Sequence, residues 1–134
     1  MEKFKNTCAE LKDTISPVFK WEADERFNTA LISFDKGVAD SVKETVSNLF
    51  ENQFDSKTIK KATKQEKKLA KSLSGLSKEQ LLFTSNGEDL TLFGAWWPWG
   101  NNQKVSLRIG LFTLEKGLVE EDDIRKHLSE WFGV

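Results

Sequence analysis

The first half of the chain contains two stretches in which apolar residues repeat at the three- and four-residue spacing of one helical face. The first stretch predicts a helix over residues 2–15, with Pro17 placed where the helix would stop. The second stretch runs from Val38 to Phe50 and predicts another helix, which Asp35 can cap. Both segments therefore read as amphipathic helices.

The second half of the chain contains two further helical patterns. Residues 57–73 predict a helix capped by Ser56. The acidic run at 120–123 then starts a last helix, because negative side chains are favourable at the positive end of the helix dipole. Its apolar side comprises Ile124, Leu128, Trp131 and Phe132.

Strand patterns lie between these helices. A β-branched and aromatic segment over 26–34 predicts the first strand. Shorter apolar segments over 81–84 and 90–97 flank an Asn-Gly pair, which is a strong hairpin signal. Over 105–114, apolar and polar or small residues alternate, as a sheet with one better-buried face requires.

The order of the predicted elements is α-β-α-α-β-β-β-α. The last three strands should form an antiparallel meander. The first strand must join the same sheet, because its backbone polar groups would otherwise be unpaired. We therefore expect one α+β domain over residues 1–134, with a four-stranded, largely antiparallel sheet and helices packed mainly on one face.

The net charge of −1 conceals a strongly basic segment, since residues 57–78 contain eight lysines and one glutamate. On a helix, seven of these lysines fall within an arc of roughly 120°. This basic face comprises Lys57, Lys60, Lys61, Lys64, Lys67, Lys68 and Lys71. It is either a solvated face or a surface for an acidic protein. Nucleic acid is the weaker reading, because the face has no arginine and no aromatic residue for base stacking.

Tryptophan is the most informative residue type, because the chain has five tryptophans and no tyrosine. Trp96 and Trp97 must point to opposite faces of one strand. Two leucines on the Trp96 side favour that side as the core, so Trp97 and Trp99 become the leading binding pair. The full set of candidate binding residues is Trp96, Trp97, Trp99, Asn101 and Asn102. Alternatively, Trp21, Trp131 and Phe132 close over this corner as a small core.

Residues suited to catalysis are scarce. The chain has one cysteine, Cys8, and one histidine, His127, on predicted helices at opposite ends. A zinc site needs three or four converging ligands, and no glycine loop precedes a helix as phosphate binding requires. We therefore predict no catalytic residue, no metal and no cofactor, although a catalytic pair of carboxylates stays open.

Localisation follows from three further observations. No apolar run approaches the roughly 18 residues of a membrane span, and the N-terminal segment lacks the apolar core of a signal peptide. One cysteine cannot form an internal disulfide, which favours a reducing compartment. We expect a cytoplasmic protein without a membrane span.

These observations favour a non-enzymatic interaction protein that uses the tryptophan-rich strand end, the basic face or both. We expect another protein as its partner, with acidic character where the lysines engage it, and a homo-oligomer stays open. A first alternative is a small-ligand binding domain or enzyme whose pocket is walled by tryptophan. A second alternative is a nucleic-acid binder that uses the basic face.

Overall fold

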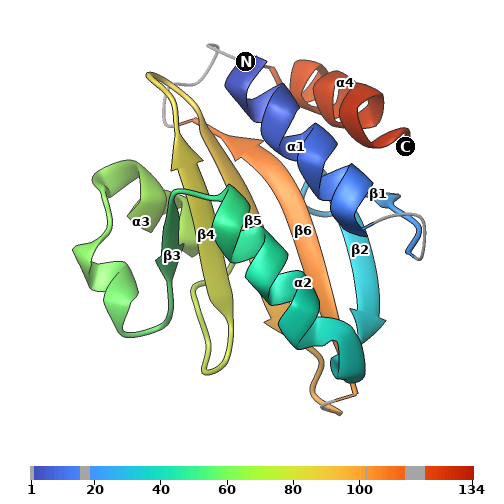
Figure 1. Ribbon diagram of the computed structural model, residues 1–134. Helices are drawn as coiled ribbons and strands as arrows, with labels where there is room; N and C mark the ends of the chain where they lie inside the picture. Colours follow the sequence, from blue (N-terminus) through green and yellow to red (C-terminus); the bar gives the residue numbers. More distant parts are fainter. Residues whose placement is uncertain (1, 16–18, 102, 114–119) are drawn as a thin grey trace.

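The computed structural model describes residues 2–15, 19–101, 103–113 and 120–134. Within them, six strands form one antiparallel sheet in the order β1-β2-β6-β5-β4-β3 (Figure 1). The strands are β1 (Glu22–Asp24), β2 (Thr29–Asp35), β3 (Asn52–Phe54), β4 (Leu81–Asn86), β5 (Thr91–Pro98) and β6 (Lys104–Phe112). The helices are α1 (Glu2–Ile15), α2 (Lys36–Leu49), the 3₁₀ helix η1 (Thr58–Lys61), α3 (Lys64–Ser72) and α4 (Glu121–Phe132).

Several predicted elements are confirmed. Helix α1 has the predicted bounds, and α4 begins at the acidic run. The Asn-Gly pair joins β4 to β5, and the Gly87 amide donates to the Leu90 carbonyl at 2.8 Å. Three predicted features lie outside the described residues. These are the helix end at Pro17, the binding role of Asn102 and the strand end at Leu114.

The α+β class is as predicted, but the sheet has six strands rather than four. The two additional strands, β1 and β3, are three residues long and lie at opposite edges of the sheet. Such short segments show no alternation over four or more residues, so the apolar pattern does not reveal them. Short edges also limit pairing with other chains.

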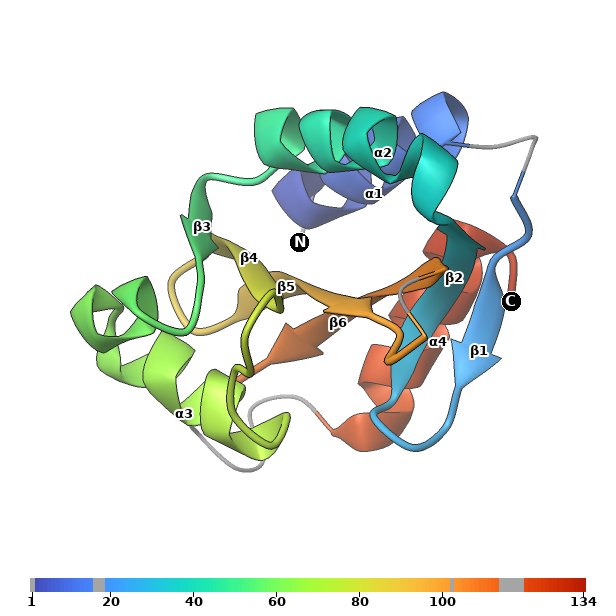
Figure 2. The same cartoon turned by 90° about the horizontal axis from the view of Figure 1, so that it is seen from below.

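The main core lies between one face of the sheet and helices α1, α2 and α4. Figure 2 shows α1 and α2 stacked over this face. Strand β6 contributes every second residue to this core, and those residues are Val105, Leu107, Ile109 and Leu111. From α1, Cys8 is fully buried, and this burial raises the pKa of its thiol to about 12.

Helix α2 differs from expectation in two details. Asp35 occupies the N-cap position, but its side chain makes no capping hydrogen bond. Val38, which the pattern places on the apolar side, is 40 % exposed. The buried side is centred on Ala39, Val42 and Val46 instead, so Val38 falls at its margin.

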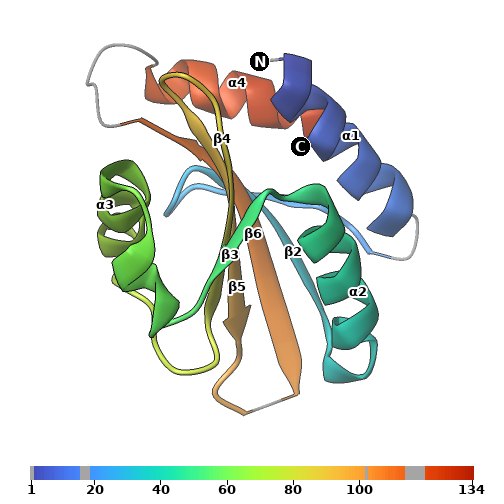
Figure 3. The ribbon, with the colours of Figure 1, turned by 60° about the vertical axis from the view of Figure 1, so that its left-hand side comes forward.

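Helix α3 covers the opposite face of the sheet, which we call the second face (Figure 3). Here Leu69, Ala70 and Leu73 pack against a set from the sheet that comprises Leu82, Phe93 and Ala95. Strands β4 and β5 are therefore buried on both faces over most of their length. Three of the four α-helices thus pack on one face, as expected, and α3 is the exception on the other.

The predicted helix over 57–73 is interrupted and forms η1 and α3. The interruption is Thr63, whose extended backbone caps α3. Its hydroxyl accepts from the Glu66 amide at 3.1 Å, and the Glu66 carboxylate accepts from the Thr63 amide at 2.9 Å. This reciprocal pair is a capping box, and it starts a new helix where the apolar pattern alone continues the old one. Ser56 is therefore not the cap of α3.

The Glu66 carboxylate also ties α3 to the sheet. Glu66 is 1 % exposed, and its second oxygen accepts from the Thr84 hydroxyl and from the Asn86 amide at 3.3 Å. Burial by itself raises the pKa of Glu66, but the hydrogen bonds from Thr84, Thr63 and Asn86 together lower the pKa below its ordinary value. The buried charge is therefore stabilised by donors from two elements.

Gly110 of β6 lies on the second face, opposite Phe93 of β5. A Cβ atom at this position would lie 2.5 Å from Phe93 Cζ and 2.8 Å from Thr29 Cγ2. The missing side chain lets the Phe93 ring extend across β6 and close that end of the second core.

No helix among the described residues is long and apolar enough to cross a bilayer.

Candidate functional site

The adjacent tryptophans of β5 lie on opposite faces of the sheet. Trp96 belongs to the main core and is 5 % exposed, as the alternation of the strand predicts. Trp97 is half-buried on the second face, where it packs against the cluster that α3 covers. Trp99 follows the end of the strand and is 41 % exposed. Trp97 and Trp99 are therefore the accessible members of the cluster.

Trp97 is part of a layer of large side chains, which we call the aromatic–arginine layer and define as Phe27, Trp97, Trp99 and Arg108. The Phe27 and Trp97 rings meet edge to face, with centroids 5.2 Å apart. The Arg108 guanidinium lies 4.6 Å from the Trp97 centroid and 5.6 Å from that of Phe27. Aromatic contacts and cation–π attraction therefore hold these three side chains together.

Arg108 is held from below by an ion pair. Its Nε lies 2.8 Å from Asp24 Oδ2, and both side chains are mostly buried. The same carboxylate oxygen accepts from the Thr29 hydroxyl at 3.2 Å. Strands β1, β2 and β6 thus position the guanidinium beneath the rings, which restricts its rotamers before any partner binds.

Trp99 is exposed but anchored. Its indole N–H donates to the Ser106 hydroxyl at 2.7 Å, and that hydroxyl lies 3.2 Å from Ser33 Oγ. The Trp99 amide also donates to the Lys104 carbonyl at 2.8 Å, and the Lys104 ammonium lies 5.5 Å from the ring centroid. The ring is therefore presented at a fixed position at the end of β5.

Of the two candidate asparagines, Asn101 and Asn102, the structure describes only the first. Asn101 is exposed, and its side-chain oxygen accepts from the Gln103 amide at 3.1 Å. This hydrogen bond indicates a role in shaping the turn before β6. Asn102 is outside the part of the chain that the structure describes.

The seven lysines of the basic face are all exposed, but they do not form one helical stripe. Lys57 precedes η1, Lys60 and Lys61 end it, and the other four lie on α3. None of the seven takes part in the two ion pairs found among the described residues. The basic surface therefore exists, in two segments that meet at Thr63.

The residues considered for catalysis lie in structural environments. The raised pKa of Cys8 keeps its thiol protonated at neutral pH, which is unsuited to a nucleophile. The His127 ring stacks on Trp131, with centroids 5.3 Å apart. No group of three or more His, Cys, Asp or Glu residues in the described ranges could hold a metal ion.

The alternative in which Trp21, Trp131 and Phe132 cover the tryptophan corner is not what the structure contains. These residues belong to the main core, and the Trp21 and Phe132 rings lie 4.4 Å apart. Trp97 lies on the other face and packs on Phe27. On the second face, the side chains that cover Trp97 are therefore Phe27 and Arg108 of the aromatic–arginine layer.

Sequence reasoning missed Phe27 and Arg108. The available signal for Arg108 is the alternation of β6, which places it on the same side of that strand as Ser106. The pairing of β6 with β5 brings Arg108 opposite Ala95 and beside Trp97, and this pairing can be known only from the register of the sheet.

Comparison of the chain with protein-family models, with curated proteins and with solved structures finds no match.

Proposed function

We propose that the chain is a non-enzymatic binding protein whose aromatic–arginine layer contacts another protein. The observation that carries this proposal is the position of Trp99, exposed and anchored at the end of β5 beside the half-buried Trp97. Large side chains of this kind dominate the binding energy of protein interfaces, with tryptophan and arginine the most enriched.

The rigidity of the layer supports the same proposal. Three of its members lie on or beside strands in the middle of the sheet, and Arg108 is already paired with Asp24. Side chains that are ordered before association lose less entropy when a partner binds. The layer is therefore suited to a partner that packs on these side chains without rearranging them.

The charge near the layer supports an acidic partner. Helix α3 packs on the same face of the sheet as the layer, and its exposed side carries four lysines of the basic face. Such a field accelerates association with an acidic surface and weakens as salt is added. Nucleic acid has less support, because Arg108 is engaged by Asp24 and every cation of the basic face is lysine.

The cellular setting that we propose is the cytoplasm. Cys8 is free and fully buried in the main core. A single reduced cysteine is typical of chains from reducing compartments.

The experiment compares two residues of matched exposure on different elements. Trp99 is 41 % exposed and Val38 is 40 % exposed, on α2. Wild type, Trp99→Ala and Val38→Ala are used to capture partners from the native cell, and the captured proteins are identified by mass spectrometry. We expect wild type and Val38→Ala to retain the same partner and Trp99→Ala to lose it, because only Trp99 belongs to the layer.

Both variants should stay folded, since neither side chain belongs to a hydrophobic core of the described residues. Retention of every wild-type partner by Trp99→Ala would refute the proposal. Loss of the same partner with Val38→Ala would also refute it, because the contact surface would then include α2.

A further inference from the structure

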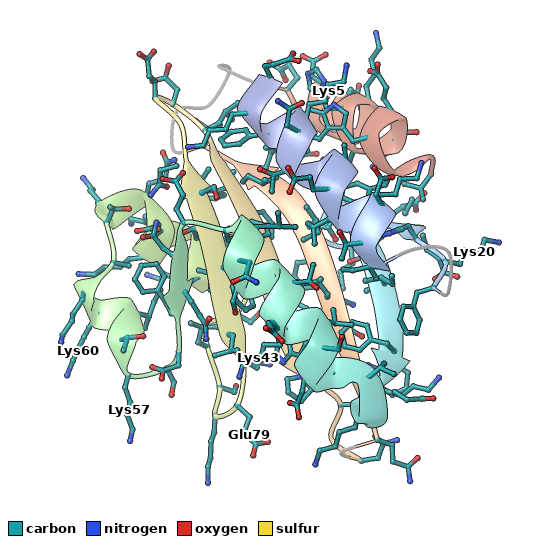
Figure 4. All side chains as sticks on the ribbon, in the orientation of Figure 1. Lys5, Lys20, Lys43, Lys57, Lys60 and Glu79 are labelled. Atoms are coloured by element: carbon teal, nitrogen blue, oxygen red, sulfur yellow. The ribbon has the colours of Figure 1, made fainter. Side chains whose placement is uncertain are left out.

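A groove lies beside the N-terminal half of α2, on the side of the sheet opposite the aromatic–arginine layer. It consists of two adjoining hollows of about 220 and 410 Å³, and Lys43, Glu79 and Trp96 line both. Figure 4 labels Lys43 on α2, Lys57 in the segment before η1, and Glu79 in the segment before β4. Three separate parts of the chain therefore meet around Trp96.

Trp96 provides an aromatic wall in this groove. Among the described residues, the indole N–H groups that are sealed from solvent without a partner are those of Trp21 and Trp97. Trp96 is not among these two, and although it is only 5 % exposed it lines both hollows.

The rest of the lining combines apolar contacts with excess positive charge. Ala39, Pro98 and Leu81 extend the apolar surface around Trp96. Five lysines and three acids also line the groove, among them Lys36 and Lys43 from α2 and Lys104 from β6. Within the described ranges none of the eight is in an ion pair. Lys104 already lies over the Trp99 ring, so the other four lysines are the ones available to a ligand.

One of the three acids is already engaged by the protein. The Asp55 carboxylate accepts from the Thr58 and Lys57 amides, each at 2.8 Å. These hydrogen bonds hold the pKa of Asp55 below its ordinary value. Asp55 therefore stabilises the turn into η1. Of the three acids in the groove, only Asp40 and Glu79 remain to balance the charge of the lysines.

We infer that this groove binds a small organic anion, such as a carboxylate or a phosphate ester with an apolar body. The apolar body would lie against Trp96 and Pro98, and the anionic end would meet the Lys43 ammonium. This site is separate from the proposed protein contact, because Trp96 and Trp97 face opposite sides of β5. Either site can be disproved without affecting the other.

The test uses phenyl phosphate as the probe and follows the five indole N–H signals in nitrogen–proton NMR spectra. Replacement of Trp96 by phenylalanine identifies its signal. We expect phenyl phosphate to shift the Trp96 signal at millimolar concentration. Benzyl alcohol and inorganic phosphate should bind more weakly, because each lacks one half of the proposed recognition.

Two single substitutions with the same charge change provide the matched control. Lys43→Gln removes a lysine of the groove, and Lys67→Gln removes an exposed lysine of α3. Loss of one charge-assisted contact should weaken phenyl phosphate binding about tenfold in Lys43→Gln and leave it unchanged in Lys67→Gln. Lys36→Gln, at the rim of the groove, is the second variant if Lys43→Gln does not fold.

Three outcomes would overturn the inference. The first is a Trp96 signal that phenyl phosphate does not move, including the case in which only the Trp99 signal moves. The second is equal binding by the lysine variants of the groove and of α3. The third is equal affinity for inorganic phosphate and phenyl phosphate, which would identify a site for the bare ion.

Discussion

The buried carboxylate of Glu66 should contribute more to stability than any exposed charge of this protein. Replacing Glu66 by leucine introduces an apolar side chain of similar size and removes the acceptor for three donors. These are the Thr63 amide, the Thr84 hydroxyl and the Asn86 amide. Thr84 is fully buried and has no access to water. Asn86 is only half-buried, so its side-chain N–H can turn to water while its oxygen still accepts from the Thr91 hydroxyl.

The expected magnitude follows from these three contacts. A hydrogen bond to a charged group contributes about 1.5–3 kcal/mol, and a buried donor left unsatisfied costs about 1–3 kcal/mol. Thr63 and Asn86 can recover part of this loss, because they are not fully buried. We therefore expect Glu66→Leu to lower the free energy of unfolding by roughly 3 kcal/mol. Glu66→Gln keeps the acceptor oxygen and should cost roughly half as much.

The assay is urea unfolding of wild type and both variants at several pH values. Because the folded-state pKa of Glu66 is below its ordinary value of 4.5, the ionised group stabilises the fold fully above that pH. This contribution is lost as the pH falls through the folded-state pKa. The stability gap between wild type and Glu66→Gln should therefore be constant near neutral pH and become narrower in acid.

A double-mutant cycle with Thr84→Val tests the origin of the effect. Removing both partners leaves no unsatisfied donor at Thr84, so the double variant should be more stable than the sum of the single losses predicts. If Glu66→Leu is as stable as wild type, or if the gap to Glu66→Gln does not change with pH, the network does not hold α3 as described.

Three further predictions concern other parts of the fold. Trp96→Ala should cost roughly 3–5 kcal/mol of unfolding free energy, as for other large core aromatics, and Trp97→Ala much less; equal losses would contradict the assignment of faces. Gly110→Ala should cost roughly 1–3 kcal/mol, because its Cβ would lie 2.5 Å from Phe93, and Phe93→Leu should partly restore stability in the same denaturation assay. Replacing four exposed lysines by glutamine should leave the melting temperature unchanged or slightly raised, because like charges repel, and a large drop in a thermal scan would show that they are packed or paired. These lysines are Lys60, Lys64, Lys67 and Lys71.

The apolar pattern predicts the long elements well and the short ones poorly. Helix α1 and the β4–β5 hairpin are visible because each repeats its period several times or contains a strong turn signal. Strands β1 and β3 become strands through pairing with β2 and β4, which sequence periodicity does not express. The break in the helix over 57–73 does have a local signal, since Thr63 and Glu66 have the spacing of a capping box.

The candidate site shows the same division between local and distant information. That Trp96 and Trp97 face opposite ways follows from strand geometry alone, and the two leucines correctly identify the core side. The cover on the second face depends on where α3 packs and on how β6 pairs with β5. Phe27 and Arg108 reach Trp97 only through these long-range arrangements, so no segment of the sequence contains the layer.

The burial of Cys8 has a practical consequence for measuring how the protein opens. The chain has one thiol, which is fully buried in α1 and has a pKa raised to about 12. A thiol reagent can therefore modify the native protein only when α1 detaches from the main core and exposes Cys8. The rate of modification thus reports the free energy of that opening without an introduced label. Comparing this rate with the global unfolding rate would show whether α1 opens alone or together with the sheet.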